Sequence, residues 1–207
     1  LAMLLNSLAV TLMIKADFGI SAVSSVPYAL YVAFPALSLG TWNAIIQCTW
    51  LIVTMIAIRK VKPGYIVSFG LAFLFGIMMD VWEGIIAPWP GAMVLRIGYF
   101  TVGFIMMAIG ISLFFLCGTP VLPFDTVPRA FIVEKGVSVR AARPGFDLLN
   151  LSLALAIGLA FSGRPVGIGI GTLLGAVLMG IAVAAINQWI SSRYHLRPKW
   201  KVLGDLA

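Results

Sequence analysis

Asp125 is the residue whose surroundings most favour a chemical role. It lies in the apolar stretch GTPVLPFDTVPRAF (118–131), between Pro123 and Pro128. Prolines interrupt a helix and leave backbone groups without partners, and an ionisable group among membrane-embedded residues is costly unless it has a function or a partner. We therefore expect Asp125 to bind a solute or carry a proton, with Pro128 in the same site. The alternative is that Asp125 only caps the helix that begins there.

A second set of polar residues lies near the starts of two other apolar stretches. Asp147 and Asn150 are three residues apart in one stretch, and Asn43 and Gln47 are four residues apart in another. Polar groups at these spacings share a helix face and can point together into a helix bundle. We expect Asp147, Asn43 and Asn150 to line one substrate site. As an alternative, Asp147 only pairs with Arg143, four residues earlier.

Asp80 lies deep inside an apolar stretch and needs a partner there, for which Arg129, Ser68 or an ion are the candidates. Burial raises the pKa of a carboxyl group, so Asp80 is a candidate for proton coupling. Arg129 is expected to neutralise Asp125 or to hold an anion at the substrate site. The alternative for Arg129 is a role as a cytoplasmic anchor.

Other kinds of chemistry lack their residues in this sequence. The sole histidine, His195, lies in a basic tail, and there is no Cys/His cluster with metal-ligand spacing and no HExxH motif. Gly167, Gly169 and Gly171 resemble a dinucleotide fingerprint, but small residues in an apolar stretch favour close helix packing instead. We predict no metal, no cofactor and no enzymatic activity.

Composition places these residues in a lipid bilayer. Of the 207 residues, 61% are hydrophobic and 10% are charged, whereas soluble domains have about 25% charged residues. The net charge of +7 comes from short connections and the basic tail 193–207. This is the usual pattern of cytoplasmic flanks of membrane spans, so we predict no nucleic-acid binding.

A bilayer core requires about 20 apolar residues for each helix. Six stretches fit, the first of them only in part, and predict an all-α polytopic membrane protein: about 1–15, 41–59, 64–87, 95–117, 145–162 and 166–191. Two further apolar segments, 19–34 and 118–135, are too short and too broken to cross alone. Whether they re-enter the membrane or lie at its surface is left open.

Lysine and arginine predict the orientation. If the connection RKVK (59–62) is cytoplasmic and each broken segment returns to the side it left, eleven basic residues lie inside and three outside. This distribution agrees with the positive-inside rule and predicts that both termini are cytoplasmic.

The order of a span, a broken segment and two more spans occurs twice. Matching positions lie about 101 to 104 residues apart: Val26-Pro27 with Val127-Pro128, Asn43 with Asp147, Ser68 with Thr172, and Gly76 with Gly180. The predicted repeats are 1–94 and 95–207. Three spans are an odd number, so the second repeat is inverted, as in many secondary transporters with a midplane site. The alternative is a purely architectural duplication with the broken segments on the membrane surface.

Three motifs carry a resemblance to a known family: GTPVLPFDTVPRAF (118–131), LSLGTWNAII (37–46) and GIGIGTLLGAVLMG (167–180). On these motifs nearly the whole chain resembles the YczE/YyaS/YitT-like bacterial membrane proteins, and the YczE branch in particular. The resemblance implies a small protein of the bacterial cytoplasmic (inner) membrane, with transport as the supposed role. It matches Phe124-Asp125 with an aromatic-Asp pair, and Thr119 in the same motif joins the expected substrate-binding residues. Ser24 stands where the second repeat has Asp125, so a symmetrical pair of carboxylates is not expected.

These observations predict a small secondary transporter or facilitator, with proton coupling as a candidate mechanism. Carboxylates at the site favour a small cationic or amine-bearing solute. The alternative function is a non-transporting membrane subunit that binds substrate or acts as a scaffold on another complex. The oligomeric state is left open, with a homodimer as one candidate.

Overall fold

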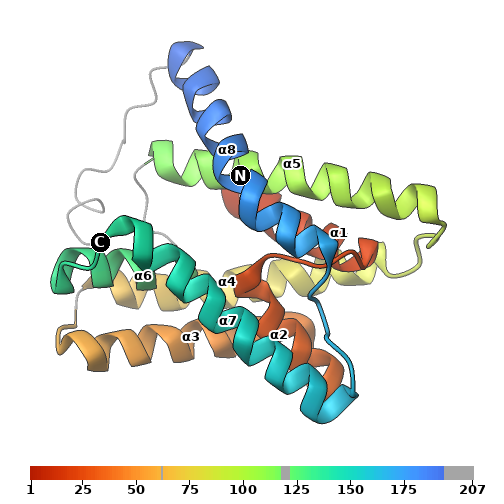
Figure 1. The fold of residues 1–207 in the computed structure, drawn as a ribbon, viewed down its shortest axis with the longest axis horizontal. Helices are drawn as coiled ribbons and strands as arrows, with labels where there is room; N and C mark the ends of the chain where they lie inside the picture. The colour runs from red at the N-terminus through yellow and green to blue at the C-terminus, as the bar shows by residue number, and fades with distance from the viewer. Residues whose placement is uncertain (62, 118–121, 194–207) are drawn as a thin grey trace.

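The computed structural model describes residues 1–61, 63–117 and 122–193 of the chain. These residues form eight α-helices and no β-strand, which confirms the all-α fold (Figure 1). The helices of the first half are α1 (Ala2–Ala16), α2 (Ala22–Ala33), α3 (Leu39–Ile58) and α4 (Pro63–Ile86). Those of the second half are α5 (Met93–Cys117), α6 (Pro123–Lys135), α7 (Val139–Ser162) and α8 (Ile170–Arg193).

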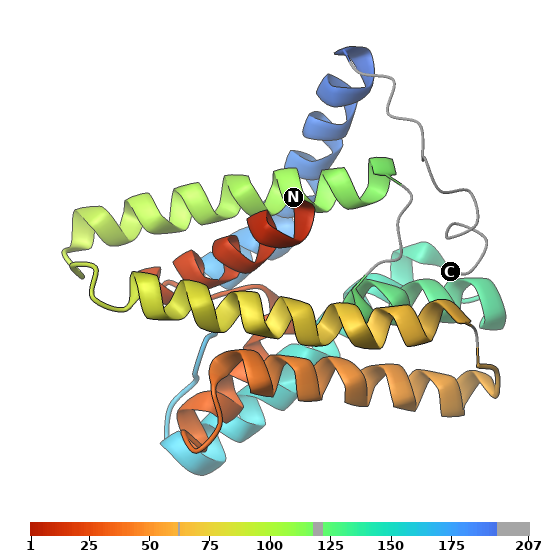
Figure 2. The same ribbon diagram turned by 180° about the vertical axis from the view of Figure 1, so that it is seen from behind.

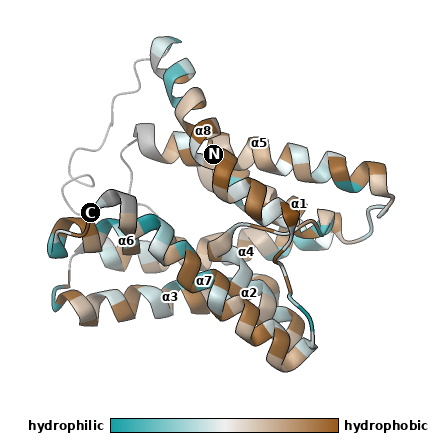
Figure 3. Ribbon diagram, in the orientation of Figure 1, coloured by the Kyte–Doolittle hydropathy of each residue, from teal (hydrophilic) through white to brown (hydrophobic). Residues whose placement is uncertain are grey.

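Five of the described helices are long and apolar enough to cross a membrane, namely α3, α4, α5, α7 and α8. Figure 3 shows hydrophobic residues over most of their length. This is what a multi-pass membrane protein requires. The helix α1 has 15 residues, fewer than the roughly 20 that a bilayer core needs, so the sixth predicted span stays a prediction.

Two helix starts differ from the prediction. The helix α7 begins at Val139, earlier than the predicted 145, and continues through Pro144. The helix α8 begins at Ile170 rather than 166, because Gly167 has a φ of +71°, in the left-handed region. Pro144 therefore does not keep α7 from starting earlier than predicted, whereas Gly167 keeps α8 from starting where the apolar stretch begins.

The segment before α8 pairs with the segment after α1. The amide of Ile20 donates to the carbonyl oxygen of Gly167 at 3.0 Å, and the amide of Gly171 donates to that of Phe18 at 2.7 Å. The side chain of Thr172 accepts from the amide of Gly169 at 3.2 Å. These bonds satisfy backbone groups that would otherwise be unpaired in a non-helical segment. They fix the starts of α2 and α8 relative to each other.

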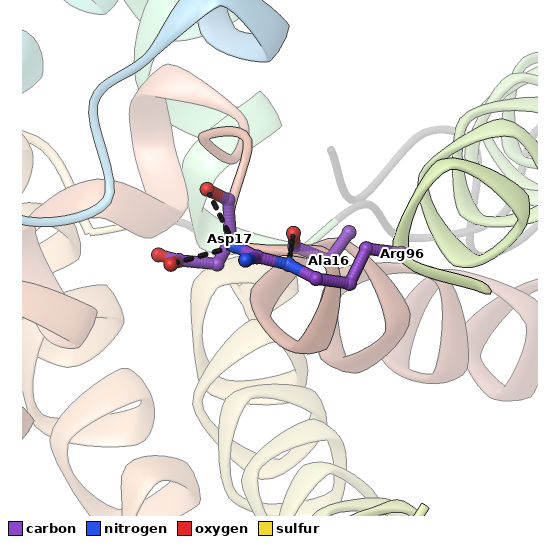
Figure 4. Close-up of polar contacts among 3 residues, drawn as sticks. All are labelled: Ala16, Asp17 and Arg96. Atoms are coloured by element: carbon purple, nitrogen blue, oxygen red, sulfur yellow. Dashed lines mark hydrogen bonds and ion pairs between the residues drawn. The ribbon is translucent and has the colours of Figure 1, made fainter. Parts of the chain in front are cut away.

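Arg96, near the start of α5, holds the end of α1 (Figure 4). Its Nε donates to the carbonyl oxygen of Ala16 at 2.7 Å, and its Nη2 donates to Oδ2 of Asp17 at 2.7 Å. The guanidinium also lies 5.4 Å from the ring centroid of Phe18. Asp17 itself has a φ of 57° and ends the helix. The chain therefore leaves α1 in a fixed direction towards α2.

Each short helix lies beside the second half of a long helix from the other half of the chain. Along α2, Val26 and Ala29 share a buried cluster with Ala154 of α7. At the far end of α2, Phe34 contacts Phe161 with ring centroids 4.8 Å apart. The start of α2 therefore lies near the middle of α7.

The helix α6 has the same relation to α3. Near its start, Phe124 and Val127 form a buried cluster against which Trp50 of α3 packs. Near its end, Glu134 pairs with Lys60, just after α3, at 2.5 Å. Val23 of α2 packs on the same cluster as Phe124 and Val127. The starts of the two short helices thus lie at one buried cluster, which also contains Phe146 of α7.

Most helix contacts of one half have a counterpart in the other. The contact of α1 with α4 matches that of α5 with α8, and the contact of α2 with α7 matches that of α6 with α3. The pairs α2–α3 and α6–α7 also correspond, while α1 and α5 pack on each other. The close pair α3–α4 has no comparable α7–α8 contact among the described residues. Figures 1 and 2 show α8 projecting away from α7.

The pair α3–α4 is held by two glycines and one carboxylate. Gly40 and Gly76 lie so close that a Cβ on either would overlap the backbone of the other. Oδ1 of Asp80 accepts from the amide of Gly40 at 2.6 Å, and Oδ2 accepts from Oγ of Ser38 at 2.7 Å. A carboxylate at the positive end of a helix dipole is favourable. Asp80 of α4 therefore caps α3, and Ser38 and Gly40 take the place of the predicted partners Arg129 and Ser68.

The Asp80→Ala variant is expected to be less stable by about 2–4 kcal/mol, because two hydrogen bonds to a charged acceptor are lost. The measurement is thermal unfolding of the detergent-purified protein, with Asp80→Asn as the control that keeps the shape and one acceptor oxygen. The control should lose less stability than the alanine variant. Equal unfolding temperatures for Asp80→Ala and the native chain would contradict the capping role.

Candidate functional site

A cavity of about 700 Å³ lies where the starts of α2 and α6 meet. Its walls come from α1 and α5 on one side, and from α7 and α8 on others. Ligand sites of small molecules usually have volumes of about 300–1,000 Å³. Residues 21–24 of α2 and its N-cap line the cavity, as do Leu122, Phe124 and Asp125 at the start of α6. The cavity is therefore built around the starts of two short helices, which run on through Pro27 and Pro128 without a break.

Three charged residues meet at this cavity. Nη1 of Arg143 donates to Oδ1 of Asp125 at 2.6 Å, and Nε of Arg143 lies 3.6 Å from Oδ2 of Asp147. All three side chains are half-buried, with exposed fractions of 41% for Arg143, 23% for Asp125 and 34% for Asp147. Of the described residues that line the cavity, these alone carry charge. Two carboxylates and one guanidinium leave a net charge of −1.

Local structure explains why the three charges converge. Arg143 and Asp147 are four residues apart on α7, so they share one face of that helix. Asp125 is in the first turn of α6, which begins with Pro123 and has no side-chain cap from Leu122. A proline is tolerated at this position because its missing N–H would have no helical partner. The contact between α6 and α7 then brings Asp125 to Arg143.

Asn6 of α1 also lines the cavity. Its side chain is buried, with 6% exposed, and its Oδ1 accepts no hydrogen bond from any described residue. Gly110 of α5 makes room for it, since a Cβ there would lie 2.5 Å from Oδ1. A buried amide oxygen without a donor is costly. Asn6 is therefore a polar group of the cavity wall with unused capacity to accept a hydrogen bond.

Hydroxyl groups complete the polar lining. Oγ of Ser21 donates to Oγ of Ser24 at 2.9 Å at the start of α2. The hydroxyl of Thr172 donates to the carbonyl oxygen of Gly167 at 3.3 Å. These bonds mainly shape the walls, because the hydroxyl donors of Ser21 and Thr172 are used within their own segments.

The predicted site residues separate into two groups. Asp125 and Asp147 line the same cavity, while Asn43 and Asn150 are fully buried and do not line it. Asn150 accepts from Nε1 of Trp50 at 3.2 Å and donates to the carbonyl oxygen of Phe146 at 2.8 Å. Asn150 thus tethers α3 to α7. Its oxygen already accepts one hydrogen bond, and its side chain does not line the cavity.

Asn43 and the remaining predicted residues lie elsewhere. Asn43 accepts from Nε2 of Gln47 inside the buried face of α3. Pro128 is buried within α6, and the side chain of Arg129 is exposed. Neither lines the cavity among its described residues. Thr119 lies outside the described residues, and Asp80 is used to cap α3.

Sequence reasoning missed two residues of the cavity. Arg143 was named only as a partner of Asp147, and Arg129 was one candidate to neutralise Asp125, with a cytoplasmic anchor as its alternative. In the structure Arg143 pairs with Asp125. The spacing of four between Arg143 and Asp147 was the available signal. Asn6 was missed although it is an amide in an apolar stretch, which is the same signal that singled out Asn43.

Comparisons with known proteins give a family but no function. A model of a family of unknown function, DUF6198, matches residues 1–188. No curated protein and no solved structure matches the chain. The resemblance to the YczE branch is not tested by these findings and stays a prediction.

Proposed function

The chain belongs to the DUF6198 family, and we propose that it is a small secondary transporter or facilitator of the bacterial cytoplasmic membrane. Its solute is small and cationic or amine-bearing. The observation that carries this proposal is that the starts of two short helices, α2 and α6, line one cavity with a net charge of −1. Non-helical backbone at membrane depth is tolerated where it is buried in protein or lines a cavity.

The proposal includes an inverted duplication of residues 1–94 and 95–207, with α1 as a sixth span and both termini in the cytoplasm. The matching helix contacts of the two halves support it. The cavity lining supports it as well, because Ser21 to Ser24 and Leu122 to Asp125 are counterparts 101 residues apart. In transporters with such repeats, the substrate site lies at the repeat interface near the midplane.

The difference between the two halves suggests a transport cycle. In the first half, α3 and α4 are closed at Gly40 and Gly76. The counterpart positions, Pro144 and Gly180, lie on the walls of the cavity between α7 and α8. In the proposed orientation the closed pair lies near the outer surface, so the cavity faces the cytoplasm. If α7 closes on α8 while α3 opens from α4, the site becomes closed to the cytoplasm and open to the outside.

Asp125 is the proposed coupling residue. It shares Arg143 with Asp147, so neutralising Asp125 changes the charge that a cation meets in the cavity. Protons and cationic solutes then compete for the same carboxylates. This competition would link uptake or release of the solute to the proton gradient.

The test is flux into proteoliposomes, with radiolabelled benzyltrimethylammonium as a permanently charged probe. We expect the Asp125→Asn variant to lose at least about 90% of the flux and its dependence on a pH gradient, since one of two acidic groups is removed. Glu83→Gln is the matched control, because Glu83 is bonded to Tyr31 and lies outside the cavity lining. Full flux by Asp125→Asn across the pH range would contradict the coupling role. Absence of flux with intact binding would favour the non-transporting subunit.

A further inference from the structure

We infer that the solute of this cavity is an amphipathic monocation, in which one ammonium or amidinium group with N–H donors is carried on an apolar body. The inference rests on the proposed function and narrows its substrate class. It also adds Asn6 to the residues that bind the solute. The argument for the solute has three parts: the charge of the cavity, the unpaired amide oxygen of Asn6, and the apolar walls.

The charge of the cavity selects a single positive charge. Arg143 makes its short contact with Asp125 at 2.6 Å, whereas its distance to Asp147 is 3.6 Å. The longer distance exceeds that of a hydrogen bond, so the carboxylate of Asp147 keeps acceptor capacity. One monocation at Asp147 brings the net charge of the lining to zero. An anion would meet two carboxylates and a guanidinium that is already engaged.

Asn6 selects an N–H donor on the solute. Its amide lies against Gly110 in the wall contributed by α1, and its oxygen is unpaired. A half-turn of the terminal amide exchanges its oxygen and nitrogen, so the acceptor can face the cavity. An ammonium or amidinium group supplies the N–H donors that such an acceptor needs, at Asn6 as at Asp147. A quaternary ammonium group has no N–H to offer.

The walls select an apolar body. Apart from the polar residues above, the lining consists mainly of aliphatic, aromatic and methionine side chains, among them Phe75, Met107, Ile111, Phe124 and Met179. Methionine adapts its shape to irregular apolar groups and contacts aromatic rings favourably. A volume of about 700 Å³ with such walls is far larger than an ammonium ion needs. Among the described residues no group of three or more His, Cys, Asp or Glu is placed to hold a metal ion.

The test measures the Kd of six small probes for the full chain in lipid nanodiscs; the sixth is an N-trimethyl analogue, and the first five differ in charge or in apolar body. They are phenethylammonium, its neutral analogue 2-phenylethanol, the anion 3-phenylpropanoate, the zwitterion phenylalanine, and ammonium without a body. We expect phenethylammonium to bind at least tenfold more tightly than each of the other four. Its N-trimethyl analogue should bind several-fold more weakly, because it lacks the N–H donors.

Variants connect the binding to the named residues. Asp147→Asn should weaken phenethylammonium binding at least tenfold, and Asp147→Glu should restore it to within about threefold. Asn6→Leu should weaken binding several-fold, and the trimethyl analogue should lose little in that variant. Glu83→Gln should leave every Kd unchanged. Unfolding temperatures without probe show that each variant is folded.

Several results would overturn the inference. These are equal or tighter binding of phenylalanine, 3-phenylpropanoate or ammonium, no binding of phenethylammonium to folded protein, or unchanged binding in Asp147→Asn. The outcome is separable from that of the proposed function. Binding as expected without flux leaves the substrate class standing and rejects transport. Flux of an anionic or neutral solute retains transport and rejects the substrate class.

Discussion

The Gly76→Val variant is expected to lose its native fold, with a cost of about 3 kcal/mol or more. A Cβ at Gly76 would lie 2.5 Å from the carbonyl oxygen of Gly40. The clashing atom belongs to the backbone of α3, so no flexible side chain can move aside to relieve it. Overpacking of a close contact typically costs 1–3 kcal/mol and more where the backbone must shift. The measurements are the yield of monodisperse protein in detergent and its unfolding temperature.

Gly70→Val is the matched control for Gly76→Val. Gly70 lies on the same helix, and a Cβ there would meet nothing within 4 Å. Any intrinsic effect of valine in a helix is therefore common to both variants. We expect Gly70→Val to unfold within a few degrees of the native chain. If the two variants unfold at the same temperature, the close approach of α3 and α4 does not hold the first half together.

The parts of the fold that sequence predicted well depend on local properties. The apolar length of each long helix is visible in the chain, so its existence could be predicted without knowing its neighbours. The starts of α7 and α8 could not, because they depend on partners. Gly167 is kept out of the helix by a bond from Ile20, which is almost 150 residues away in the chain. Nothing near Gly167 predicts that partner.

The candidate site shows the same division. Asp125 and Asp147 were singled out because a carboxylate in an apolar stretch is locally unusual. The cation beside Asp125 could not be assigned in this way: Arg129, one candidate, is exposed on α6, while Arg143 reaches Asp125 from α7. Asn43 and Asn150 carry the same local signal as Asn6. Whether such an amide pairs inside the protein or lines a cavity depends on helix packing, which cannot be predicted from local composition.

The asymmetry between the two halves links the fold to the proposed transport cycle. Asp80 caps α3 in the first half, but its counterpart in the proposed repeat, 104 residues later, is Ala184. The second half therefore has no carboxylate clamp at this position, and α8 packs extensively only on α5 among the described helices. Separating α3 from α4 breaks the two hydrogen bonds that Asp80 accepts, whereas a movement of α8 relative to α7 breaks no such bonds in the described part of the chain. We expect the unclamped α8 to be the element that moves.

The Gly180→Val variant is expected to fold normally and to lose transport. A Cβ at Gly180 would meet nothing within 4 Å, so the open arrangement of α7 and α8 tolerates valine. In the closed arrangement Gly180 would take the place that Gly76 has in the first half, against the backbone of Pro144. A clash of about 3 kcal/mol there would lower the population of the closed state about a hundredfold. Flux of benzyltrimethylammonium into proteoliposomes should fall by at least tenfold.

Gly175→Val is the control that separates a blocked closure from a filled cavity. Both glycines line the cavity and a Cβ at either meets open space, so both variants narrow it by similar amounts. The counterpart of Gly175 in the first half is Leu71. The closed pair of α3 and α4 therefore has room for a large side chain at this position. Gly175→Val should therefore keep most of its flux. Gly180→Val should still bind phenethylammonium but lose most of its flux of benzyltrimethylammonium. Equal flux in the two variants would mean that α7 and α8 do not close on each other as α3 and α4 do.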